Sequence, residues 1–212
     1  MPDRFLPLFP LNLVAFPGEK LNLHIFEPRY KQLIGECRDH QRTFGIPPYV
    51  DGKLSTCGTE MQLEKVVREY PNGEIDIVVR GVSAFLLDNF VRVAPGKLYG
   101  GGSVQTLEND PKPDALIIEE IAQLYQRFHQ ILRTGQHRDD LYRPDVSFSL
   151  ANEIGLSLSQ RAEILAMPHE AERERFILDH LRHVVPVLEA ADSTRVRIQA
   201  NGTFHKHPTI EL

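Results

Sequence analysis

The residues PLFPLNLVAFPGEKLNLHIFEPRY, from Pro7 to Tyr30, decide the fold of this 212-residue chain. Prolines interrupt the apolar runs, which are therefore too short for helices, and they are too apolar for surface loops. We predict buried strand segments that end at a turn at Pro17-Gly18. From Leu21 to Ile25, aliphatic residues then alternate with other residues, which is the period-two pattern of a strand.

A helix is expected directly after this strand. Pro28 suits the first helical turn, where its missing N–H costs no hydrogen bond. We expect the helix to run from Arg29 to about Asp39, with one apolar face formed by Tyr30, Leu33, Ile34 and Cys37.

Period-two patterns continue and predict a first half that is rich in strands. Pro71-Asn72-Gly73 indicates a tight hairpin. Gly81 indicates a bulge or a tight bend, and the three glycines at 100–102 indicate weakened pairing at a barrel corner. The expected strands are at 42–46, 57–70, 75–80, 85–93 and 98–107.

The period of the apolar residues changes from two to about 3.6 after the segment at 108–113, so we divide the chain there. Asp114 is expected to cap a long helix that Gly135 ends. A shorter helix is expected at 148–154, and Ser157 to Gln160 forms a capping box for another.

The last helix is expected at 170–189, and Pro186 should kink or shorten it. After it, Val196 and Ile198 alternate with polar residues, and Asn201-Gly202 favours a hairpin turn before Phe204. The fold class is therefore α+β. Its expected parts are a β-rich subdomain at 1–108, a helical subdomain at 109–192 and a terminal arm or hairpin at 193–212.

The composition is that of an ordinary soluble domain, with 42% hydrophobic and 25% charged residues and a net charge of −5. Up to Glu108 there are 12 basic and 13 acidic residues, and after it 12 basic and 16 acidic. Neither half is basic. This argues against non-specific binding of nucleic acid, which requires clustered lysine and arginine.

The expected location is the cytoplasm. Cys37 and Cys57 form no disulfide framework and suit a reducing compartment. We find no leader pattern at Met1 and no apolar run near the about 20 residues that a membrane helix needs.

The first segment also resembles a known family. PLFPLN, FPG and LHIFEPRY at 7–30 are similar to the opening of the N-terminal substrate-recognition domain of Lon proteases. The similarity continues at 44–46, 57–59 and 77–82 and extends to roughly residue 190. It implies a PUA-like β-barrel followed by a helical bundle, and a role in binding proteins rather than cutting them.

The resemblance has limits. In that family a long helix leads toward an ATPase module, whereas the pattern at 195–212 departs from this. The glycine and lysine at 52–53 lack the spacing of a phosphate-binding loop. The Ser/Lys peptidase domain has no counterpart. We therefore expect a stand-alone, non-enzymatic member with no cofactor, whose partners are polypeptide clients or one protein.

Aromatic residues in the first segment are the candidate contacts to a bound chain. Phe16, Phe26 and Tyr30 lie in or near turns. Most such aromatics are expected in the core, because they bury large areas. One or two can instead line a groove for apolar segments of a client.

Charged residues inside the apolar motifs have two interpretations. Glu27, Arg29 and Arg80 can contact a bound chain, or they can form an ion pair that neutralises charge inside the fold. We favour the second and predict a structural pair between Glu27 and Arg80, joining the first helix to the hairpin.

Other chemistry has weak support. Ser103 lacks the final glycine of a nucleophile elbow. His180 with His183, and His205 with His207, lack a third ligand at zinc-site spacing, so we expect no metal site. Three alternatives remain open: an RNA-binding PUA-like module, a hydrolase with an unrecognised site, and an adaptor for one folded partner.

Overall fold

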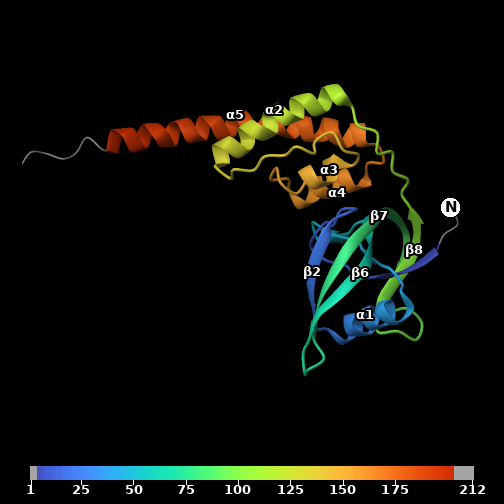
Figure 1. Cartoon of the computed structure of the whole chain (residues 1–212). Helices are drawn as coiled ribbons and strands as arrows, with labels where there is room; N and C mark the ends of the chain where they lie inside the picture. The colour runs from blue at the N-terminus through green and yellow to red at the C-terminus, as the bar shows by residue number, and fades with distance from the viewer. Residues whose placement is uncertain (1–3, 203–212) are drawn as a thin grey trace, which may run out of the picture.

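The structure is a computed structural model that describes residues 4–202, the last seven of them as helix backbone alone. A curved sheet forms the first half and a layer of helices the second (Figure 1). Helices α2 (Ala115–Leu132), α3 (Val146–Leu150), α4 (Leu158–Ala166) and α5 (Glu170–Gly202) cover one end of the sheet, and α1 (Pro28–His40) lies at the opposite end. The predicted α+β class is confirmed. The division at residue 108 stays a prediction, because the two halves share a core.

The main sheet has the strand order β2-β7-β6-β3-β1-β8, and β8 pairs again with β7. Five strands therefore form a barrel-like ring, and β2 is attached outside it. A separate hairpin joins β4 (Tyr49–Val50) to β5 (Lys53–Leu54). The main strands are β1 (Arg4–Leu8), β2 (Lys20–Ile25), β3 (Phe44–Ile46), β6 (Cys57–Glu69), β7 (Ile75–Val91) and β8 (Gly100–Thr106).

Strand β7 combines two strands that the sequence predicts separately. It pairs with β2 up to Arg80 and with β8 from Phe85. At Gly81 the register with β6 shifts, which confirms the predicted bulge. A Cβ atom at Gly81 would lie 2.2 Å from the carbonyl oxygen of Phe16. Only glycine lets the first segment pass so close to β7 at this point.

The glycines at 100–102 do not interrupt the pairing, which corrects the prediction of a weak point there; the bend predicted with it stays a prediction. They belong to β8, where each pairs with β1 on one side, and Gly101 and Gly102 also pair with β7 on the other. A Cβ atom on Gly102 would lie 2.2 Å from the carbonyl oxygen of Asn89. The missing side chains therefore allow close approach of the strands.

Helix α1 (Pro28–His40) begins and ends close to the predicted limits, with Pro28 in its first turn. Its buried residues are the four predicted ones, and Leu33 and Ile34 are at most 1% exposed. They pack with Phe44, Ile77 and other strand residues into one of the core clusters.

The helical half consists of α2 (Ala115–Leu132), α3 (Val146–Leu150), α4 (Leu158–Ala166) and α5 (Glu170–Gly202). Both predicted caps are confirmed. The Asp114 carboxylate accepts a hydrogen bond of 3.1 Å from the Leu116 amide, and Ser157 and Gln160 cap each other's backbone amides. Helix α3 begins two residues earlier than predicted and is followed by turns to Gly155.

Helix α5 corrects the prediction for the end of the chain. It is not shortened at Pro186 and continues to Gly202, so the predicted hairpin is wrong for 195–202. A helix that is already nucleated extends at little cost, and the short alternation at 195–199 is compatible with helix as well as strand. Phe204, His205 and His207 lie outside the described residues.

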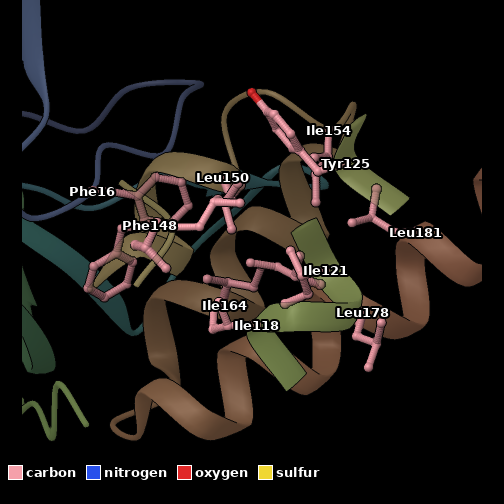
Figure 2. Packing of buried hydrophobic residues seen from close by; sticks show 14 of the residues in the cluster. Phe16, Ile118, Ile121, Tyr125, Phe148, Leu150, Ile154, Ile164, Leu178 and Leu181 are labelled. Carbon is pink, nitrogen blue, oxygen red and sulfur yellow. The ribbon is translucent and has the colours of Figure 1, made fainter. Parts of the chain in front are cut away.

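One core cluster joins the sheet to the helices (Figure 2). Val14, Phe16, Cys57 and Ala84 enter it from the first half, and the rings of Phe16 and Phe148 lie beside each other on its sheet side. The helices add residues such as Ile118, Ile121, Ile164, Leu178 and Leu181.

Candidate functional site

The three predicted contact residues lie in three different surroundings. Phe16 is 1% exposed and belongs to the core between sheet and helices. Tyr30 is 7% exposed and packs at the far end of the sheet. Phe26, just after β2, is 57% exposed. They do not form one surface, and their role in binding stays a prediction.

Phe16, from the first half, is held by groups of the helical half. Its ring stacks on Phe148, with 5.4 Å between ring centroids, and the Arg161 guanidinium lies 5.4 Å from its centroid. Arg161 Nη2 also donates a hydrogen bond of 2.7 Å to the carbonyl oxygen of Val14. The Arg173 guanidinium in turn lies 4.1 Å from the centre of the Phe148 ring. These contacts fix α3 and α4 against the sheet.

A cleft opens beside this stack, where the sheet meets α3. Its cavity measures about 370 Å³. A smaller cavity of about 120 Å³ shares Pro17, Val82, Asp145 and Phe148 with it. The cleft is lined by Phe16, Pro17, Gly18, Glu19, Val82, Arg143, Pro144, Asp145, Phe148, Ser149 and Asn152.

Buried charges hold the helical wall of the cleft. Arg173 and Glu170 are 0% exposed, with 2.6 Å between Arg173 Nη2 and Glu170 Oε2. Arg173 Nε donates to the Ser147 hydroxyl at 2.8 Å, and Nη2 donates to Asp145 at 3.0 Å. The Ser147 amide donates to Glu170 at 2.9 Å. Each charge is paired, as burial requires, and α3 is thereby tied to the start of α5.

Glu174 lies one residue beyond this network and is also 0% exposed. One carboxylate oxygen accepts a hydrogen bond of 2.8 Å from the Asp114 amide, while the other has no partner within the described residues. Burial raises the pKa of Glu174 to about 7, and the negative charges of Glu170 and Asp114 act in the same direction.

The predicted pair between Glu27 and Arg80 is wrong. Glu27 pairs with Arg29 at 2.7 Å, and Arg80 pairs with Glu64. The antiparallel register explains this, because it sets Lys20 opposite Arg80 and carries Glu27 to the other end of β2. Hydrogen bonds from Lys20 and Arg80 hold the pKa of Glu64 below its usual value.

A second cavity, of about 360 Å³, lies where α1 begins. Tyr30 forms part of its wall and stacks on Phe9, with 3.8 Å between ring centroids. The cavity is lined by Leu8, Pro10, Arg29, Tyr30, Tyr49, Phe90, Arg92 and Gly100.

A third and wider cavity, of about 560 Å³, lies between β1 and the segment before β3. Arg42 also lines this cavity, and its other two cations, Arg4 and Lys97, are already paired, with Glu60 and Glu36 respectively. They are therefore less available to a ligand than an unpaired side chain.

The histidine and serine candidates gain no chemistry from the fold. His180 Nε2 lies 3.0 Å from the carbonyl oxygen of Ile154, a contact that ties α5 to the turn after α3. Ser103 lies in β8, opposite Phe5 and Asn89. No group of three or more histidine, cysteine or acidic residues suited to a metal ion occurs among the described residues.

Residues 5–183 match the family model described as the substrate-binding domain of the ATP-dependent protease La (LON). The chain belongs to this Lon substrate-binding domain family. The match extends from β1 into α5 and includes every residue that lines the cleft.

Solved structures support this Lon-domain assignment. The crystal structure of a Lon N-terminal domain protein from Xanthomonas campestris is 27% identical, with a TM-score of 0.66, and the alignment covers 83% of this chain and 98% of that one. The N-terminal domain of a Mycobacterium avium complex Lon protease is 16% identical, with a TM-score of 0.65 and coverage of 84% and 98%. The second likeness concerns the fold alone.

Sequence reasoning missed most of the residues around the cavities in this Lon-type domain. Val82 had a usable signal, since it follows the glycine at which a bulge is expected, and bulges can re-aim a side chain. The sequence around Tyr49, Phe90 and Arg92 contains no signal that would predict their place at a cavity. No helix in the part of the chain described here combines the length and apolarity needed to span a bilayer.

Proposed function

We propose that this domain binds polypeptide segments non-covalently and carries out no reaction on them. Membership of a substrate-binding domain family supports this, because the matched model describes binding and not catalysis. We also propose a cytoplasmic location and a PUA-like type for the ring of strands.

The observation that carries the proposal is the cleft between sheet and helices. Phe16 and Phe148 give it an apolar floor, and Val82, 49% exposed, stands at its rim. Arg143 and Asp145 supply polar groups on the helical side. An apolar floor with a polar rim suits an apolar side chain of an extended peptide, whose backbone needs hydrogen-bonding partners.

Strand addition is a second way for the same domain to hold a peptide. Strand β2 stands at the end of the sheet order and pairs with β7 alone in the described residues, so one of its edges is open. Phe26 follows this strand and is exposed. A peptide that pairs with β2 would gain main-chain hydrogen bonds and an aromatic contact at the strand's end.

The alternatives have less support. RNA binding requires a basic surface, and the first half carries 12 basic and 13 acidic residues. A hydrolase requires a nucleophile with a base, and Ser103 lies in a paired strand with no histidine or carboxylate bonded to it in the described part of the chain. An adaptor for one folded partner differs from the proposal in selectivity alone.

The test measures binding of a fluorescently labelled, unfolded, apolar-rich polypeptide by anisotropy. Val82→Lys places a charge at the cleft rim, and Val67→Lys is the matched control on β6, where Val67 is 59% exposed and lines none of the three cavities. We expect Val82→Lys to weaken binding about tenfold, a change of about 1.4 kcal/mol, and Val67→Lys to leave it unchanged.

Three results would contradict the proposal. The first is no binding of the unfolded polypeptide. The second is an equal loss of affinity for Val82→Lys and Val67→Lys, which would show that the cleft does not bind the polypeptide. The third is tighter binding of a short RNA whose affinity falls steeply with salt, since phosphate contacts have that signature.

A further inference from the structure

The cavity at the start of α1 combines aromatic walls with positive charge. Tyr30, Tyr49 and Phe90 supply rings, and Arg29 and Arg92 supply guanidinium groups. No acidic side chain lines it within the described residues. Its volume, about 360 Å³, suits one or two amino-acid side chains rather than a folded surface.

The two arginines differ in how far they are neutralised. Arg29 Nη2 lies 2.7 Å from Glu27 Oε2, and the Arg29 guanidinium lies 4.6 Å from the centre of the Tyr30 ring. Arg92 is exposed and has neither an ion pair nor a side-chain hydrogen bond within the described part of the chain. The cavity therefore carries about one uncompensated positive charge, which a single carboxylate would neutralise through a charge-assisted hydrogen bond.

The walls are fixed before any ligand arrives. Tyr30 is held by its stack on Phe9, at 3.8 Å between centroids. At Gly100 a Cβ atom would lie 2.6 Å from the carbonyl oxygen of Val91, so β8 meets the end of β7 without room for a side chain there. A preformed wall lowers the entropy lost when a ligand binds.

We propose that this cavity binds a carboxylate group of a polypeptide, with Arg92 as its main partner and an adjacent apolar side chain packed on Tyr30, Tyr49 and Phe90. The carboxylate can come from the chain's C-terminus or from an Asp or Glu side chain. This inference rests on the proposed binding of polypeptides and adds the chemistry of the recognised group.

The experiment compares three labelled peptides of one apolar sequence: a free C-terminal acid, the C-terminal amide, and the amide with one internal glutamate. Arg92→Gln removes the unpaired charge, and Lys65→Gln removes one charge from an exposed position on β6 away from the cavity. Thermal melts check that both variants fold.

We expect the wild-type chain to bind at least one carboxylate peptide about tenfold more tightly than the plain amide, as a charge-assisted hydrogen bond implies. Arg92→Gln should abolish this difference, and Lys65→Gln should preserve it. Preference for the free acid identifies a chain end as the source, and preference for the internal glutamate identifies a side chain.

Equal binding of acid, glutamate peptide and amide by the wild-type chain would overturn this inference. An equal loss for all three peptides in Arg92→Gln, or displacement of the acid peptide by a 5′-phosphorylated oligonucleotide through Arg92, would also overturn it. In each of these cases the proposed function still holds if the amide peptide binds to the wild-type chain and Val82→Lys weakens that binding. No binding of any peptide would overturn both.

Discussion

The two ends of the sheet contain aromatic residues from the same segment, yet α2 to α5 cover one end and α1 alone packs at the other. At the covered end Phe16 is 1% exposed and stacks on Phe148 of α3. At the other end Tyr30 borders an open cavity, and Phe26 is 57% exposed. Similar aromatic residues of one segment therefore either hold the two halves together or contribute to the solvent-exposed surface, depending on which elements pack over them.

The largest effect is expected from Phe16→Ala. Truncation would leave a cavity between sheet and helices and lower the free energy of unfolding by about 3–5 kcal/mol. Urea denaturation followed by circular dichroism measures this. A loss below about 1 kcal/mol would mean that the junction does not depend on the stack.

Arg173→Met tests the charges that support the covered end. It would leave Glu170 buried without its cation and lower the free energy of unfolding by about 3–5 kcal/mol. Adding Glu170→Gln should restore part of the loss, because the unpaired charge disappears. If the double variant is no more stable than the single one, the pair is not the source of the effect.

Glu174 makes the covered end sensitive to pH. Its pKa in the folded chain, about 7, is above its ordinary value of 4.5 because the carboxyl is buried. The folded chain then holds the proton more tightly than the unfolded chain. This contribution to stability is fully present below about pH 4.5, is lost as pH rises toward 7, and is of order 3 kcal/mol.

Glu174→Gln is the comparison that isolates this effect, since Arg173, Glu170 and Asp114 remain in place around it. The stability of the variant relative to the wild-type chain should rise between pH 4.5 and pH 7 and level off above. Denaturant titrations at several pH values measure the difference. A difference that does not vary with pH would show that Glu174 keeps an ordinary pKa.

Phe26→Ala tests the end of the sheet that α2 to α5 do not cover. The Phe26 ring stays mostly exposed in the folded chain and so buries little apolar area on folding. Its removal should therefore change the free energy of unfolding by no more than about 0.5 kcal/mol. Affinity for the unfolded polypeptide should fall if strand addition at β2 is used. A loss of several kcal/mol in stability would mean that this end, too, is held by its aromatic residues.

Local patterns explain why much of the fold could be predicted. The buried face of α1, the Asp114 and Ser157 caps and the bulge at Gly81 all depend on neighbours in sequence or on backbone geometry. The hairpin predicted at 195–202 was wrong because a few alternating residues do not distinguish a strand from the continuation of a long helix.

The candidate sites were less predictable because their residues converge from distant segments. Arg80 pairs with Glu64 since β6 and β7 are neighbours, and no spacing in the sequence indicates this. Arg92 comes together with Tyr30 and Tyr49 only when β7 and β8 reach the start of α1.

The amino-acid sequence was enough to predict the helix caps, most of the elements in their order and membership of the Lon substrate-binding domain family, because these follow from short-range chemistry and from ordered motifs. Which aromatic side chains are buried, which charges are paired and where cavities lie became clear only from the packing of the folded chain. Burial and pairing depend on how α2 to α5 pack against the sheet, and that packing joins residues far apart in the chain.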